Sequence, residues 1–247
     1  MLTVTEAQLL GWLTPVLWPF IRTLALFTTM PVFSQRSVPL RARVALSFLI
    51  TVCAQASLPP MAVVPLDSPM AVLLVIQQVL IGLSLGFAAR IVFAAIEFAG
   101  EMIGLQMGLN YAGFFDPGSG GQSTTVSRFF STVVSFLFVI INGHLLLIAA
   151  LVASFQAFPV GPEPFAFLRA LQPQVWGAEI FKLGLWIAMP MVGMLMFINL
   201  VLGVISRVSQ QMNIFAIGFP ITLGVGLLGM LLTLPMMQAP FTMALEQ

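Results

Sequence analysis

Charged side chains are scarce in this sequence. They make up 7% of the 247 residues, against roughly 25% in soluble domains. Hydrophobic residues reach 60%, and the mean hydropathy is +1.07, so the chain is expected to be a membrane protein. Its nine basic and eight acidic residues leave a formal charge of +1. It therefore lacks the basic field that attracts nucleic acid, and nucleic acid is not expected among its partners.

The residues that build metal sites and catalytic centres are nearly missing. Cys53 is the only cysteine and His144 the only histidine, which excludes an intramolecular disulfide, the zinc spacings and a Ser-His-Asp triad with the usual partners. The only aspartates, Asp67 and Asp116, lie in proline-containing loops, where we expect no catalytic carboxylate pair. We therefore predict neither an enzyme nor a cofactor or metal. Cys53 is interpreted as a small core residue and His144 as a hydrogen-bonded structural residue.

What the sequence does contain is long apolar runs. The N-terminus lacks the positive region of a signal peptide, so the first run is expected to be a retained spanning helix. No strand pattern competes with helix, and no internal repeat points to an inverted-repeat transporter. We expect an all-α, helical membrane-associated protein with six hydrophobic segments. They cover approximately Leu9–Phe33, Val44–Val64, Met70–Met107, Phe129–Phe158, Trp176–Ile205 and Ile214–Leu234.

The distribution of arginine predicts an orientation. Arg169 stands alone beside the connections on one side, and the arginines beside the first, third and fifth connections are Arg36, Arg41, Arg43, Arg128 and Arg207. Because basic residues favour cytoplasmic loops, both termini are expected on the periplasmic side, provided that the runs insert as ordinary spans.

The third run is longer than a bilayer requires. About 38 residues make a helix of roughly 57 Å, against a hydrocarbon core of roughly 30 Å. This run must either break or extend beyond the bilayer.

Three ionisable residues of the third run, Arg90, Glu97 and Glu101, point within roughly 40° of one another on a helix. Ionisable groups in apolar surroundings are paired or hydrated, so this polar stripe should face another helix or a watery cavity. One interpretation is salt bridging between subunits without a transport role. The alternative is the coupling-ion site of a small-solute secondary transporter.

Glycines recur at four-residue spacing in the same run. Gly100, Gly104 and Gly108 form one series, and Gly82 and Gly86 form another. Small residues at this spacing let a second backbone approach closely, so tight helix contacts are expected here.

The fifth run carries two further patterns. Asn199, Gly203, Arg207 and Gln211 follow one another at i+4, and this ridge is interpreted either as a surface anchor or as part of a pore mouth. Methionines concentrate around Pro190 in the segment MPMVGMLMF. They favour either plain helix packing or a surface that adapts to changing partners.

The connection GLNYAGFFDPGSGGQSTT combines bulky aromatics with glycine. Pro117 and Gly118 predict a type II turn, whereas the absence of lysine excludes a nucleotide phosphate loop. Tyr111, Phe114 and Phe115 are bulky groups on a flexible backbone, so the segment is able to close an opening and later move.

Three stretches together resemble the FliR family of type III secretion export-gate subunits. They are GLQMGLNYAGFFDPGS, the tripeptide NGH at Asn142–His144, and NLVLGVISRVSQQMNIFAIGFPITLGVG from Asn199 to Gly226. The similarity runs through nearly the whole chain. IFAIGFP and the RSVP at Arg36 are more typical of the flagellar branch than of the virulence-type homologue, which remains the alternative.

The resemblance implies that residues 1–247 are one subunit of a hetero-oligomeric export gate made of helical hairpins, in the bacterial inner membrane at the flagellar basal body. It implies FliP, FliQ, FlhB and FlhA as partners, and unfolded rod, hook and filament proteins as cargo. Residues 176–237 would be a C-terminal hairpin resembling FliQ, with Arg207, Gln210 and Gln211 at its cytoplasmic-side bend. Residues 108–127 would be the plug loop. Its implied plug and pore residues are Gly108, Tyr111, Phe114, Phe115, Asp116, Pro117, Gly118, Gly120 and Gly121.

Overall fold

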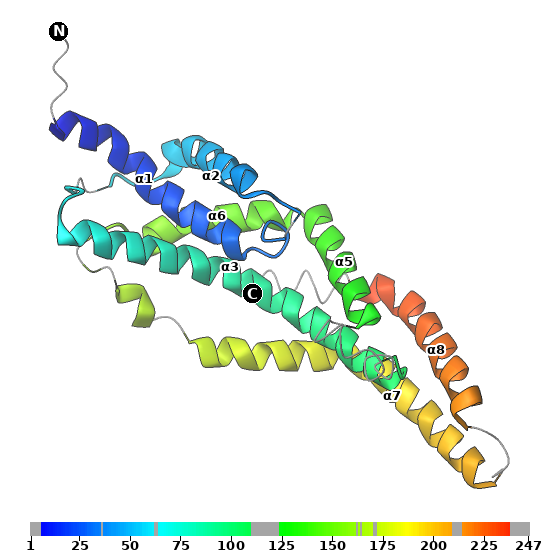
Figure 1. Cartoon of the computed structure of the whole chain (residues 1–247). Helices are drawn as coiled ribbons and strands as arrows, with labels where there is room; N and C mark the ends of the chain where they lie inside the picture. Colours follow the sequence, from blue (N-terminus) through cyan, green and yellow to red (C-terminus); the bar gives the residue numbers. More distant parts are fainter. Residues whose placement is uncertain are drawn as a thin grey trace. The chain divides into compact units, whose positions relative to one another are not determined.

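The computed structural model describes residues 6–35, 37–61, 64–109, 124–161, 163, 165–169, 172–208 and 214–237. Over this part of the chain the fold is helical without a strand, as predicted (Figure 1). The α-helices are α1 (Glu6–Thr29), α2 (Leu40–Ala54), α3 (Pro69–Gln106), α5 (Thr125–Ile140), α6 (Gly143–Ala157), α7 (Pro173–Val208) and α8 (Ile214–Thr233). Short 3₁₀ turns are η1 (Gln55–Ser57), η3 (Ala166–Arg169) and η4 (Leu234–Met237).

Five of the described helical segments are long and apolar enough to cross a membrane, and the broken pair α5–α6 makes up to six. The third run forms one continuous helix of 38 residues. The alternative that this run breaks is therefore wrong.

The fourth run was expected as one segment, but it divides at Ile141–Asn142. Asn142 has φ 58°, a left-handed conformation that asparagine tolerates better than most residues and that cannot continue a right-handed helix.

The chain forms two compact units. Unit 1 comprises Met1–Arg90 and Asn142–Gln174, and unit 2 comprises Ile91–Ile141 and Val175–Gln247. The boundary therefore falls within α3, whose first part belongs to unit 1 and whose last part belongs to unit 2.

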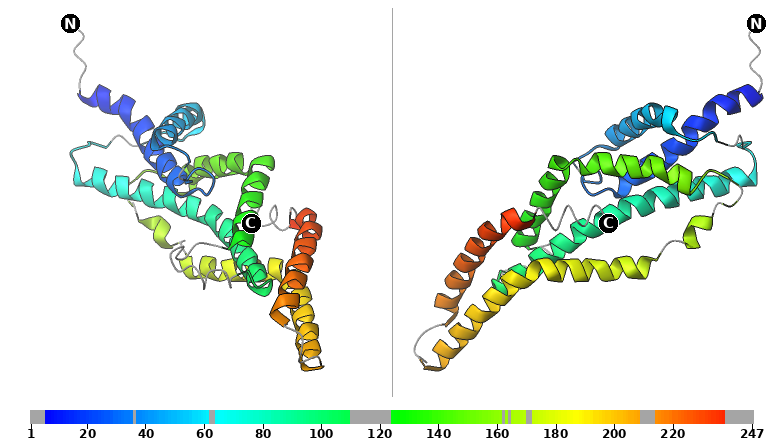
Figure 2. Two further views of the ribbon diagram at one scale, coloured as in Figure 1. Left: turned by 45° about the vertical axis from the view of Figure 1, so that its right-hand side comes forward. Right: turned by 180° about the vertical axis from the view of Figure 1, so that it is seen from behind.

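In unit 1, α1 lies along the first part of α3, and α2 and α6 lie beside α1 (Figure 2). A Cβ atom added at Gly82 would collide with the backbone oxygen of Arg22, and one at Gly86 would collide with Thr29. The prediction of a close helix contact at these glycines is confirmed. The core of this unit contains the buried side chains of Trp18, Leu26, Ala71, Leu74, Leu151, Phe155 and Val160.

A buried arginine joins the helices of unit 1. Arg22 Nε donates to Gln78 Oε1 at 2.7 Å, Nη1 donates to Ser154 Oγ at 2.8 Å, and Nη2 donates to the Phe158 carbonyl at 3.0 Å. The guanidinium also lies 3.7 Å from the centroid of the Phe155 ring. Sequence reasoning missed this network, although a lone arginine in the first apolar run was a signal for it.

The expectation for Cys53 is corrected by the position of this residue on α2. Only Ser47 and Thr51 of this helix are buried, and Cys53 is exposed, so its prediction as a core residue is wrong. The helix places a single narrow stripe in the core, and Cys53 lies off that stripe.

In unit 2, the last part of α3 packs with α5, α7 and α8. A Cβ atom at Gly184 of α7 would lie 2.6 Å from the Ala95 carbonyl oxygen, so α7 and α3 touch through their backbones. Helix α8 returns alongside α7, because Gly229 contacts Met191 and Gly218 contacts Leu202. These contacts make α7 and α8 an antiparallel pair. The likeness of residues 176–237 to FliQ stays a prediction.

Candidate functional site

The segment singled out in the sequence is described only at its two ends. Gly108 lies in the described part, whereas the other predicted plug residues lie outside the described residues. These are Tyr111, Phe114, Phe115, Asp116, Pro117, Gly118, Gly120 and Gly121. What the structure defines is the pair of roots from which this loop leaves α3 and enters α5.

The first root is a glycine helix cap. Gly108 has φ 79°, its amide donates to the Leu105 carbonyl at 3.1 Å, and the Leu109 amide donates to the Gly104 carbonyl at 3.1 Å. These two hydrogen bonds form a Schellman motif, in which glycine adopts the left-handed conformation that ends the helix. The chain therefore leaves α3 in a direction fixed by Gly108.

The second root is the capped first turn of α5. Thr124 Oγ1 accepts a hydrogen bond from the Ser127 amide at 3.2 Å, which satisfies one of the free donors at the helix start. The Thr124 amide donates to Glu101 Oε1 at 2.9 Å. Negative charge near a helix N-terminus is favourable, so Glu101 also suits the α5 dipole.

A second glutamate of α3, one helical turn before Glu101, also bonds to α5. Glu97 Oε1 accepts a hydrogen bond from Ser131 Oγ at 2.6 Å, and the Glu97 carbonyl accepts one from Ser127 Oγ at 3.0 Å. Within the chain, the two carboxylates of the predicted polar stripe therefore face α5. Arg90 is exposed and belongs to unit 1. The role of these three residues between subunits stays a prediction.

The glycine series of α3 lies directly under the second root. A Cβ atom at Gly100 would lie 2.8 Å from Ser127 Cα, and one at Gly104 would lie 3.1 Å from Thr124 Oγ1. The close backbone approach predicted for this series is thus present, and α5 is the helix that approaches α3 there. Without glycine here, the hydrogen bonds from α5 to Glu97 and Glu101 would lengthen.

The end of α3 is also held by α7 and α8. Thr222 Oγ1 of α8 lies 3.3 Å from the Met107 carbonyl oxygen and 3.1 Å from the Phe219 carbonyl oxygen of its own helix, so its proton can be donated to either. Asn199 Nδ2 of α7 donates to the Gln106 carbonyl at 3.3 Å. The Met107 side chain is fully buried and lies against Gly226 of α8. The first root therefore lies where α3 contacts both α7 and α8.

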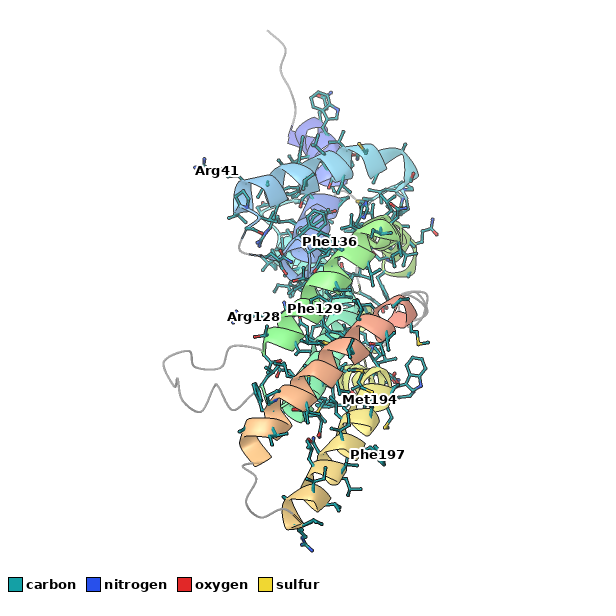
Figure 3. The ribbon with its side chains drawn as sticks, turned by 90° about the vertical axis from the view of Figure 1, so that its right-hand side faces the viewer. Arg41, Arg128, Phe129, Phe136, Met194 and Phe197 are labelled. Atoms are coloured by element: carbon teal, nitrogen blue, oxygen red, sulfur yellow. The ribbon has the colours of Figure 1, made fainter. Side chains whose placement is uncertain are left out.

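Helix α7 is much more exposed than the last part of α3. Asn199, Gly203 and Arg207 of the predicted ridge are exposed, and Gln210 and Gln211 lie outside the described residues. Met191 is buried, whereas Met189, Met194 and Met196 are exposed. Figure 3 labels Met194 and Phe197 on α7 and Phe129 and Phe136 on α5, and all four side chains are exposed. In the part of the chain that the structure describes, no group of three histidine, cysteine or acidic residues is placed to hold a metal.

Comparison with known proteins identifies the relatives of this chain. Residues 13–247 match the family described as bacterial export proteins, family 1. The chain is 44% identical to the flagellar biosynthetic protein FliR of Escherichia coli K12, over 98% of this chain and 92% of the relative. It is 42% identical to the FliR of Pectobacterium carotovorum, over 96% and 90%. It is 32% identical to the FliR of Bacillus subtilis, over 83% and 80%. The chain therefore belongs to the FliR family of bacterial export proteins.

Proposed function

We propose that this chain is a structural and gating subunit of the flagellar type III protein export apparatus, and that residues 108–127 are its plug loop. In this proposal it forms a pore with FliP and FliQ for unfolded rod, hook and filament proteins, and FlhB and FlhA are further partners. The proposed location is the inner membrane at the flagellar basal body, with periplasmic termini. The family membership supports the export role, because the match covers nearly the whole chain and the relatives are named flagellar biosynthetic proteins.

The plug assignment rests on the difference between the two well-held ends of the segment and the glycine-rich sequence between them. Both ends are fixed, by the Schellman motif at Gly108 and by the cap at Thr124. The sequence between them is rich in glycine and carries three aromatic side chains. Fixed ends joined by a glycine-rich sequence with bulky aromatics suit a closure that must return to the same place after each opening.

The exposed faces of α7 and α8 support association with other subunits. Only 17% of the apolar, membrane-length stretch of α7 is buried within the chain, and 28% of that of α8, against 50% of that of α3. Exposed polar residues such as Asn199 and Arg207 interrupt this surface. Polar groups inside a membrane are costly next to lipid, so a protein partner is the better neighbour for this face.

The test of the plug is ion leakage through the resting complex. A variant in which residues 110–123 are replaced by a short glycine-serine linker keeps both roots, so assembly should be retained. We expect the membrane potential of resting cells to fall, because an open pore dissipates about 2.3 kcal/mol per elementary charge at 100 mV. A matched variant keeps the loop length but changes Tyr111, Phe114 and Phe115 to serine, and it should leak as well. Unchanged potential in both variants, at equal expression, rules out the plug.

Purification separates the export subunit from the other interpretations. An export subunit should co-purify in mild detergent with FliP and FliQ in unequal amounts, whereas a secondary transporter would be stable alone or as a symmetric oligomer. If the loop only nucleates assembly, the linker variant would lose the complex instead of leaking.

A further inference from the structure

A groove runs along the outside of unit 1 between α1 and α2. Its first part has a volume of about 480 Å³ and is formed by Phe20 of α1 together with the α2 residues Leu40, Arg41, Val44, Ala45 and Phe48. Its second part, of about 680 Å³, also contains Phe48 and continues to Val52 and Asp67. Since Phe48 borders both parts, we treat them as one α1–α2 groove with a basic end at Arg41.

The groove is apolar except at its ends. Leu40, Phe48 and Val52 are exposed by 64%, 51% and 49%, although all three are large hydrophobic side chains. Positions 41, 44, 45, 48 and 52 share one face of α2. This face lies roughly 100° around the helix from Ser47 and Thr51, the two buried residues of α2.

Among the described residues that line the first part of the groove, Arg41 is the charged one. It is exposed, and Figure 3 shows it at the N-terminal end of α2, on the outside of the helix. The neighbouring Arg43 is occupied, because its Nη2 donates to the Gln35 carbonyl at 2.9 Å and to the Val38 carbonyl at 3.2 Å. None of the described residues that border the first part of the groove is acidic. The basic end is therefore complementary to an anion.

We propose that the α1–α2 groove binds an anionic phospholipid, with the phosphate at Arg41 and an acyl chain against Phe20, Val44 and Phe48. From Arg41 to Val52 the groove follows α2 for roughly 17 Å at 1.5 Å per residue. This length matches one leaflet of a hydrocarbon core of about 30 Å. A spanning helix of a partner would need a matching surface of about twice that length, so one lipid chain fits better.

The test is native mass spectrometry of the complete chain, purified in mild detergent and mixed with phosphatidylglycerol or with phosphatidylcholine of the same acyl chains. We expect phosphatidylglycerol to be retained preferentially. Arg41→Gln should weaken its retention about fivefold, in line with the ~1 kcal/mol that one basic residue contributes near anionic lipid. Arg41→Lys should keep most of the preference. The control Lys182→Gln removes an exposed cation elsewhere, in a helix far along the sequence, and should change nothing.

A second variant tests the apolar part of the groove. Ala45→Phe fills the space for the chain, so retention of both lipids should fall while Arg41 is intact. Helix content and elution volume check that each variant is folded. Equal retention of the two lipids by the unaltered chain, or full retention by both Arg41→Gln and Ala45→Phe, overturns the proposal. So does a photo-crosslinker at position 48 that captures a protein in native membranes instead of a lipid.

Discussion

Arg22 Nε and Gln78 Oε1 lie 2.7 Å apart, and both side chains are fully buried. The other partners of the guanidinium are the Ser154 hydroxyl, the Phe158 carbonyl and the Phe155 ring, so all of these partners are uncharged. A charge in such a place is tolerated because its donors are hydrogen-bonded. The arrangement makes Arg22 a cross-link between α1, α3 and the end of α6.

We expect Arg22→Met to destabilise unit 1. The substitution leaves Gln78, Ser154 and the Phe158 carbonyl without this donor in a buried site, which costs about 3 kcal/mol. The measurement is the midpoint of unfolding in detergent, compared with Arg90→Met, which removes an exposed arginine from α3. Equal midpoints for the two variants would show that the buried network contributes little.

The glycine contact between α3 and α1 predicts a size effect. Gly82→Ala should lower stability by about 1 to 3 kcal/mol, because its methyl group would meet the Arg22 backbone oxygen and the Ala25 side chain. Gly11→Ala is the matched control, since nothing lies within 4 Å of a Cβ atom there. Alanine favours helix by up to about 1 kcal/mol over glycine, so this control should be neutral or more stable. Thermal unfolding of the two variants would be compared, and the same shift in both would contradict the contact.

Glu101→Ala should loosen the start of α5. It removes the acceptor of the Thr124 amide, a hydrogen bond to a charged group worth about 1.5 kcal/mol or more. Amide hydrogen exchange over residues 124–128 should then become about tenfold faster. Glu101→Gln keeps an oxygen acceptor and should have a smaller effect, and Glu163→Ala, at an exposed position, should have none. Unchanged exchange in Glu101→Ala would mean that the Thr124 cap holds the root without Glu101.

The break between α5 and α6 predicts a dependence on backbone conformation. Asn142→Gly should be tolerated, because glycine adopts φ near 58° without a steric cost. Asn142→Ile should destabilise the fold by roughly 1 to 2 kcal/mol, since a β-branched side chain is strained there. Unfolding midpoints of the pair provide the comparison, and equal values would show that the left-handed conformation is not required.

Apolar length and glycine spacing were enough to predict much of the fold. The third run became α3 over nearly the predicted residues, and both glycine series mark close helix contacts, because period and side-chain size are properties of the sequence itself. The break at Asn142 was missed because the apolar runs on both sides were read as one segment, although the dipeptide Asn142-Gly143 is typical of turns.

The site was predicted in part. Glu97 and Glu101 were recognised as a stripe on one helix face, but the sequence alone does not say which helix faces them. Their partners are the N-cap Thr124 and Ser131 further along α5, and neither residue stands out in the sequence. The Arg22 network was missed for a related reason. Its acceptors come from parts of the chain far apart in sequence, and only the packed structure brings them together.

The contact of Gly100 with Ser127 limits which sequence changes the α3–α5 contact can accept during evolution. Where main chain rests on main chain, no side chain is available to shrink and make room. Acceptable replacements at position 100 are thus confined to the smallest residues. A larger residue at position 104 would have to arrive together with a smaller one at position 124, so inherited variation here should come in matched pairs.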